Sequence, residues 1–256
     1  MPKGSWVKFP YRDKAFVYDG PALKKHWDRL HRGDCEPFPK SATVQDAWRL
    51  YHAGDFGAAV EAGLAAGLDG YSAANKSAAI YATYLEKSEA RKLKILGEAM
   101  ERGEEAIAGR PKDPNAFYFY ALAAGRYSQG ISVAKALSLG LGGRVKDALL
   151  QTIRLQPKHA DAHIAFGSWN AEIVGKVGGM MARLTYGATK DAALEYFQRA
   201  IKLNPGSAIA RVEYANGLAL LFGKERLKDA EKLYAEAAKS KPADAMERLD
   251  VESAKE

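Results

Sequence analysis

The chain has 256 residues, of which 47% are hydrophobic and 27% charged, a balance that excludes a wholly disordered or collagen-like protein. Its single cysteine, Cys35, excludes an intramolecular disulfide and a cysteine-based zinc site. The net charge of +7 favours acidic partners, but the basic residues form no clustered stripe, so no nucleic-acid partner is expected. No apolar run approaches the length of about 18 residues that a membrane span needs, and no signal peptide is evident, which predicts a cytoplasmic protein.

Residues 1–40 form a basic, aromatic N-terminal arm, with nine Lys and Arg against five Asp and Glu. Seven large aromatic side chains are too many for a free tail, so the arm is expected to pack on the domain that follows it, residues 41–256. Within the arm, residues 22–33 (ALKKHWDRLHRG) predict one short helix. The aromatic residues of the arm are Trp6, Phe9, Tyr11, Phe16, Tyr18, Trp27 and Phe38.

From residue 41 onward, Ala, Leu, Glu, Lys and Arg dominate and apolar residues recur at helical spacing, which predicts an all-α domain. A small residue, a bulky residue and a proline recur at offsets of 0, 4 and 12, and a second small residue stands at offset 7. Offsets 0, 4 and 7 share one helical face, where small side chains let a neighbouring helix approach, and the proline ends the helix. The copies begin at Ala59, Ala99, Val145, Ala193 and Ala230, and the first lacks the proline.

The last two copies, Ala193–Phe197–Pro205 and Ala230–Tyr234–Pro242, carry the spacing typical of the tetratricopeptide repeat (TPR), which the domain resembles. The resemblance implies a TPR-like α-solenoid of about five helical hairpins. The prolines at 111, 157, 205 and 242 stand further apart than the period of about 34 residues, so two units must contain insertions. These are residues 128–144, the first insertion, and residues 172–190, the second insertion, and both are rich in glycine.

A narrower resemblance lies in the run from His159 to Pro205, whose long hydrophobic insertion ends in Gly187 before an Ala-Leu-x-Tyr-Phe helix. This run looks like the TPR domain of the regulator of microtubule dynamics family. The resemblance implies a helical interaction domain and not an enzyme, and no catalytic residue set is visible in the sequence.

The leading functional hypothesis is a non-enzymatic scaffold or adaptor module whose concave groove binds a peptide or helical segment of a protein partner. The register of the TPR resemblance places a mixed apolar and polar set of first-helix residues on the concave side. The arm of the chain itself is an alternative occupant of this groove. The predicted groove residues are Asn115, Tyr118, Leu122, Arg126, Ile164, Ser168, Val212 and Asn216.

The alternative hypothesis is a small-molecule or anion site at the two insertions, where basic residues accompany glycines. The predicted anion-binding residues are Arg144, Lys146, Lys176, Arg183 and Lys190. The second insertion also carries an apolar stripe that could dock on a membrane or a partner, or cover the edge of the solenoid. The stripe consists of Val174, Val177, Met180, Met181, Leu184 and Tyr186.

His159 and His163 stand four residues apart, a spacing that can place two imidazoles on one helical face for a metal. A third ligand is not evident, so structural roles are favoured, and no metal or other cofactor is predicted. The final stretch, residues 245–256 (AMERLDVESAKE), is charged and polar, which predicts a solvated cap of the solenoid or a frayed tail.

Overall fold

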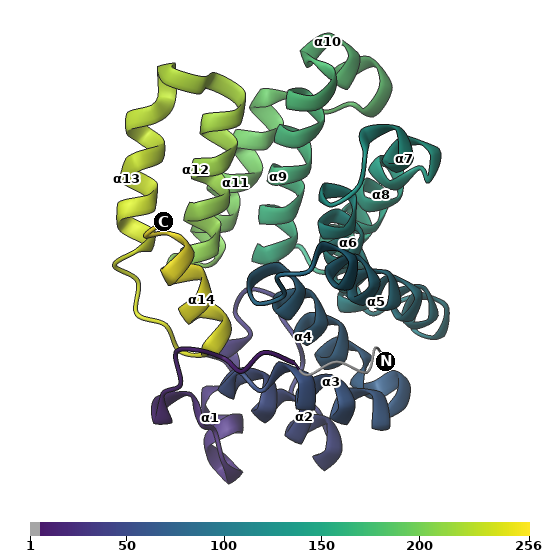
Figure 1. Ribbon diagram of the computed structural model, residues 1–256, viewed down its shortest axis with the longest axis vertical. Coiled ribbons are helices and arrows are strands. Elements are labelled where there is room, and N and C mark those ends of the chain that lie inside the picture. The colour runs from purple at the N-terminus through teal and green to yellow at the C-terminus, as the bar shows by residue number, and fades with distance from the viewer. Residues whose placement is uncertain (1–5) are drawn as a thin grey trace.

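The computed structural model describes residues 6–256, so the first five residues of the predicted arm lie outside the described part. Five consecutive helical hairpins follow one another around the molecule (Figure 1). Their helices are α2 (Ala42–Ala53) with α3 (Phe56–Ala65), α4 (Tyr71–Tyr84) with α5 (Glu89–Gly109), α6 (Pro114–Gln129) with α8 (Leu141–Leu155), α9 (Ala160–Val177) with α11 (Lys190–Leu203), and α12 (Ala208–Phe222) with α13 (Leu227–Ala237). Residues 6–256 contain no strand, and none of their helices has the length and hydropathy needed to span a membrane. The predicted all-α solenoid of five hairpins is confirmed.

Local sequence signals set where these helices begin and end. The Asp113 carboxylate caps α6 by accepting a hydrogen bond from the Asn115 backbone N–H at 2.9 Å, and Pro114 takes the first helical position, where no N–H is needed. Ser207 caps α12 in the same way, its hydroxyl accepting from the Ala210 N–H at 3.2 Å. Gly54 ends α2 in the left-handed conformation, with φ of 86°.

The repeated small and bulky positions form the contacts between hairpins. The residues at offsets 0, 4 and 7 of the fourth copy, Ala193, Phe197 and Ala200, are all fully buried. The ring of Phe197 lies between Gly167 of α9 and Gly217 of α12, and a Cβ on either glycine would come within 2.8 or 2.6 Å of that ring. These glycines therefore let three helices share one aromatic side chain.

Both predicted insertions lie in the connections within hairpins. The first contains the short helix α7 (Val133–Ser138) between α6 and α8, and the second contains α10 (Gly179–Met181) and a wide helical turn at 182–186 between α9 and α11. The predicted apolar stripe is divided: Val174 is buried and Tyr186 half-buried, whereas Met180, Met181 and Leu184 are exposed.

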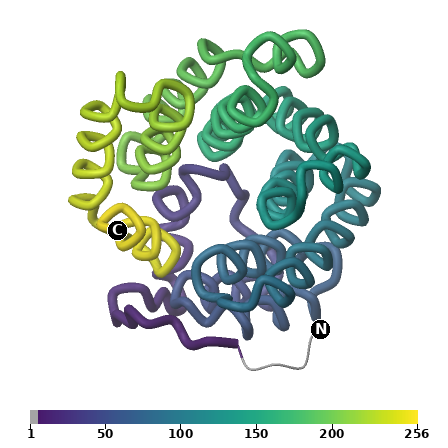
Figure 2. The backbone as a smooth tube through the Cα atoms, turned by 45° about the horizontal axis from the view of Figure 1, so that its top comes forward, coloured from purple at the N-terminus to yellow at the C-terminus, as the bar shows by residue number. Residues whose placement is uncertain are grey.

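The prediction of a solvated cap or frayed tail at the C-terminus is wrong. Residues 245–253 form the helix α14 (Ala245–Ser253), in which Ala245, Leu249 and Val251 are buried. The helix packs against both α12 and α2, so the last hairpin returns to the first and the solenoid closes into a ring (Figure 2). The periodicity of this short stretch is obscured because its buried face also carries a carboxylate, Asp250.

The segment before the first hairpin contributes to this closure. It contains the predicted short helix, α1 (Gly20–Leu30), whose Arg29 forms a bidentate ion pair with Glu247 of α14. The Tyr18 hydroxyl donates to the Ala243 carbonyl at 2.6 Å, and the carboxylate of Asp244 lies 2.8 Å from Nδ1 of His52 in α2. After α1, the chain crosses the inside of the ring before it enters α2 (Figure 2).

Candidate functional site

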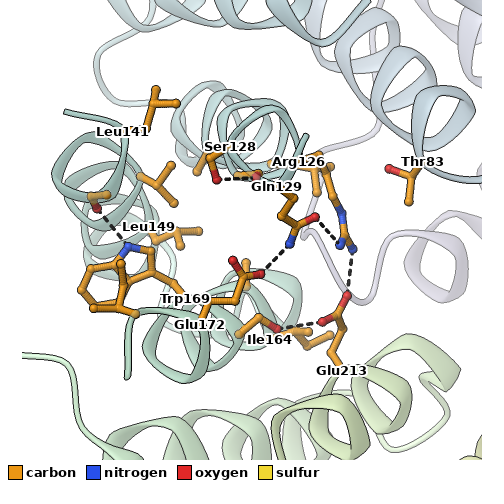
Figure 3. Close-up of a pocket in the computed structure, with 18 of the residues that line it drawn as sticks. Thr83, Arg126, Ser128, Gln129, Leu141, Leu149, Ile164, Trp169, Glu172 and Glu213 are labelled. Atoms are coloured by element: carbon orange, nitrogen blue, oxygen red, sulfur yellow. Dashed lines mark hydrogen bonds and ion pairs between the residues drawn. The ribbon is translucent and has the colours of Figure 1, made fainter. Parts of the chain in front are cut away.

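A cavity of about 390 Å³ lies inside the ring, and most of its wall is apolar. Leu122 of α6, Leu149 of α8 and Ile164 of α9 lie on this wall, together with Ile80 of α4 and Met246 of α14. The Trp169 indole N–H donates to the Gly142 carbonyl at 2.9 Å, which holds α9 against the start of α8 (Figure 3). The volume falls within the range of about 300–1,000 Å³ that is usual for ligand pockets.

A chain of polar contacts runs along one side of the cavity and joins α6, α9 and α12 (Figure 3). The Arg126 guanidinium pairs with Glu213 at 2.8 Å, and the Ser168 hydroxyl donates to the other oxygen of the same carboxylate at 2.9 Å. Gln129 accepts from Arg126 at 3.3 Å and donates to Glu172 at 2.5 Å. Burial opposes the charge on Arg126, but Glu213 more than offsets it, so the pKa of Arg126 lies above its ordinary value.

A buried ion pair closes one end of the interior. Lys76 of α4 donates to Asp34 at 2.6 Å, and Nδ1 of His31 lies 2.9 Å from the other oxygen of that carboxylate. Burial alone would raise the pKa of Asp34, yet His31 and Lys76 hold it well below its usual range. Burial lowers the pKa of His31 to about 4, so this imidazole is neutral at pH 7 and Lys76 is the cation that pairs with Asp34.

Asp161, in the first turn of α9, faces both the cavity and the segment that crosses the ring. Its backbone N–H donates to the Gly33 carbonyl at 3.0 Å, and a Cβ on Gly33 would lie only 2.7 Å from the carbon of the Asp161 carboxyl group. A side chain at residue 33 would force the Asp161 carboxyl group to move, so glycine permits this close approach. Burial raises the pKa of Asp161 to about 7, against the attraction of Lys76.

Asp250 of α14 also lies on the cavity wall, and it is 2% exposed. The Tyr84 hydroxyl donates to it at 2.6 Å. Burial raises the pKa of Asp250 to about 8, because one hydrogen bond does not replace the lost hydration and the carboxylates of Glu247, Asp244 and Asp161 add to the effect.

We expect Asp250→Asn to flatten the pH dependence of stability above pH 6.5. A carboxyl group whose pKa is raised on folding stabilises the fold most below its unfolded value, and this stability is lost as the pH rises towards about 8. Between pH 6.5 and pH 8, the free energy of unfolding measured in urea should fall by about 2 kcal/mol more for the wild type than for Asp250→Asn. In this variant the amide oxygen can still accept the hydrogen bond from Tyr84. Asp147→Asn, at an exposed site of α8, should retain the wild-type slope, and an equal slope in Asp250→Asn would contradict the assignment.

His159 joins α9 to α6 and to the crossing segment. Its Nδ1 accepts from the Ala162 backbone N–H at 3.0 Å, so the proton is on Nε2, which lies 2.9 Å from the Asn115 side-chain oxygen and donates to it. The Asn115 amide donates in turn to the Glu36 carboxyl group at 2.6 Å. Burial lowers the pKa of His159 to about 3, because protonation would charge a buried ring and set two N–H groups against each other. His159 is thus a helix cap.

The structure brings together five of the eight predicted groove residues. Tyr118, Leu122, Arg126, Ile164 and Ser168 line the cavity. The other three lie elsewhere: Asn115 is fully buried, Val212 packs against α13 and α14 residues, and Asn216 accepts a hydrogen bond from Tyr234 of α13.

On α12 the residues that face the cavity are Ile209 and Glu213, one turn apart. The prediction placed Val212 and Asn216 on this side of α12, and the cavity is lined by Glu213 instead. The charged residues of the cavity wall that the sequence analysis did not predict include Glu213, Lys76 and Asp250. A signal for Glu213 was present, because it follows Ile209 by four residues and shares its helical face.

Four of the five predicted anion-binding residues contact separate acceptors of the protein itself. Arg144 pairs with Glu104 of α5, and Lys176 pairs with Glu172. Lys146 donates to the Tyr186 carbonyl at 2.6 Å, and Lys190 donates to the Leu221 carbonyl at 2.7 Å. Arg183 is exposed in the second insertion. Within residues 6–256, no group of three His, Cys, Asp or Glu side chains has a geometry that could hold a metal ion.

Comparison with known proteins agrees with this architecture. A search of curated proteins finds no significant match. The structure is similar to the crystal structure of a thermophilic TPR protein of Thermus thermophilus, with a TM-score of 0.57 and 17% sequence identity over 83% of this chain and 96% of that chain. The sequence model of the family described as regulator of microtubule dynamics protein 1-3 matches residues 71–256, which include four of the five hairpins and α14. The chain therefore belongs to the regulator of microtubule dynamics protein 1-3 family.

Proposed function

We propose that the protein is a non-enzymatic binding module that holds a peptide or helical segment of a protein partner in the cavity inside the ring. The observation that supports this proposal is the composition of the cavity wall, in which aliphatic side chains lie beside the polar chain from Arg126 to Glu213. Aliphatic anchors of a partner would bury apolar area, and the Gln129 and Glu172 side chains would bind its exposed peptide groups.

The N-terminal segment limits the space that such a partner can use. Residues 33–36 contact α4 through Lys76, α6 through Asn115 and α9 through the backbone of Asp161. We propose that this segment occupies one end of the groove as an internal ligand, and that an external segment binds the remaining part, between α6, α9 and α12.

A peptide selected from a phage-displayed random library on the wild-type protein tests the proposal. Ala165 lines the cavity from α9, and Ala165→Phe adds a ring to the space that an anchor would fill. We expect the Kd of the selected peptide, measured by calorimetry, to rise at least about tenfold for Ala165→Phe. Ala235→Phe, which adds the same ring to the exposed surface of α13, is the matched control and should leave the Kd unchanged.

Equal affinity for wild type and Ala165→Phe would contradict binding in the cavity. Leu122→Asn provides a second variant, since it removes an aliphatic wall residue without adding bulk, and the melting temperature of each variant shows whether it is folded. A small molecule is the second candidate ligand, because Val133 and Leu137 of the first insertion and Val177 of the second lie on the wall of the same cavity. Two results together would favour a small molecule. The selection would yield no peptide, and the wild type would enhance the fluorescence of anilinonaphthalene sulfonate while Ala165→Phe would not.

A further inference from the structure

The connections within three successive hairpins lie at one edge of the ring. In stacked hairpins each first helix runs towards this edge and each second helix returns from it, so the turns between α6 and α8, α9 and α11, and α12 and α13 are neighbours (Figure 1). The two insertions share the wall of the cavity, and Lys190 of the second lies over the Phe222 ring at 4.7 Å. We call residues 128–144, 172–190 and 220–228 the tip edge.

Large apolar side chains are exposed at the tip edge. Met180 is 77% exposed and Leu184 76% exposed in the second insertion, and Leu137 of α7 is 55% exposed in the first. Within residues 6–256, eight of the eleven exposed large hydrophobic residues belong to the tip edge. The five others at the tip edge are Val133, Leu139, Met181, Leu220 and Leu227.

Positive charge is concentrated on the same residues. The tip edge holds eight Lys and Arg against two Glu, a net charge of +6. Two of the eight cations, Arg144 and Arg226, pair with Glu104 and Asp229, which lie outside the tip edge. Four others, Lys135, Arg183, Lys224 and Lys228, are exposed and form no ion pair within residues 6–256. The edge therefore combines exposed apolar side chains with four cations that have no acidic partner in the described part of the chain.

We propose that the tip edge docks on an anionic lipid surface, with its apolar side chains in the boundary between headgroups and acyl chains and its cations against lipid phosphates. A surface that combines exposed apolar residues with Lys and Arg has the composition of interfacial membrane-binding segments. The apolar residues come from three separate turns, and a fluid lipid surface conforms to such a set. The core of a protein interface is instead a contiguous, closely packed patch.

Flotation with vesicles tests this proposal on the full chain. The protein should bind phosphatidylcholine vesicles that contain roughly one-third phosphatidylserine, bind pure phosphatidylcholine at least about tenfold more weakly, and lose affinity as salt rises. Two double variants, Met180→Ser with Leu184→Ser and Lys135→Glu with Arg183→Glu, should each lower the partition coefficient at least about tenfold. Their melting temperatures should not change, since all four side chains are exposed.

The matched control is Val17→Ser with Lys25→Glu, which removes one exposed apolar residue and one exposed cation near α1, at the opposite end of the molecule (Figure 1). This variant should bind vesicles like the wild type. Absence of binding to the anionic vesicles, or an equal loss in the control, would overturn the proposal. Self-association of the wild type that rises with concentration, and that the double variant Met180→Ser with Leu184→Ser lacks, would also overturn the proposal. The tip edge would then be an interface with a second copy of the chain.

Discussion

Lys76→Met is expected to lower the free energy of unfolding by about 3–5 kcal/mol, the cost of leaving a buried charge without its partner. Lys76 is 3% exposed, and Asp34 would keep only the neutral His31 beside it. Urea unfolding measures the loss. Hydrogen exchange of residues 31–40 should show that the segment inside the ring opens first, because Lys76 is its ionic contact with α4.

The double variant Lys76→Met with Asp34→Asn distinguishes loss of the ion pair from loss of packing. It removes both charges, so we expect it to be more stable than Lys76→Met alone, although both variants carry the same methionine side chain at position 76. Lys40→Met is the control, since Lys40 is exposed in the same segment and its replacement should cost within about 0.5 kcal/mol. If Lys76→Met were as stable as the wild type, the ion pair would not hold the segment in place.

Ala200→Glu is the second substitution from which we expect a large loss, on the order of 4 kcal/mol or more. Ala200 is fully buried at the seventh offset of its repeat, where it packs against Ile164 of α9 and Ala210 of α12. A carboxylate there would lie between three helices without a cation. The thermal midpoint and the urea midpoint should both fall.

Gln198→Glu is the matched control for Ala200→Glu, because it adds the same carboxylate two residues earlier on the exposed face of α11. We expect it to change stability by no more than about 0.5 kcal/mol. Equal stability of the two variants would show that the repeat register assigned to α11 is wrong.

The hairpins could be predicted from the sequence because their signals are local. Small residues at offsets of 0 and 7 and a proline at 12 determine one helix face and one helix end, and Ala193, Ala200 and Pro205 need no knowledge of distant residues. The same register correctly predicted residues of α6 and α9 that line the cavity. On α12 the prediction failed for Val212, because the neighbouring residue Glu213 lines the cavity instead.

The polar interior could not be predicted from local patterns. Asp34, His52 and Asp250 belong to residue types that usually face solvent, and each is buried because of a partner 42 to 192 residues away. Such pairings leave no periodicity in either segment. For the same reason the sequence of α14 resembled a solvated cap. Its Asp250 accepts a hydrogen bond from Tyr84 of α4. Asp244, in the turn before α14, contacts His52 of α2 and caps the first turn of α14.

The closure of the ring changes how the repeats depend on one another. In an open solenoid each repeat contacts only its neighbours, so repeats can fray singly from either end and can be added or removed. Here the contacts of Arg29 with Glu247, His52 with Asp244 and Tyr84 with Asp250 span 218, 192 and 166 residues. We therefore expect the two ends to unfold together. Each end also covers a face of the other that an open array would expose to solvent. A sixth hairpin would separate these partners by the width of a repeat, so we expect an inserted repeat to break the contacts that close the ring.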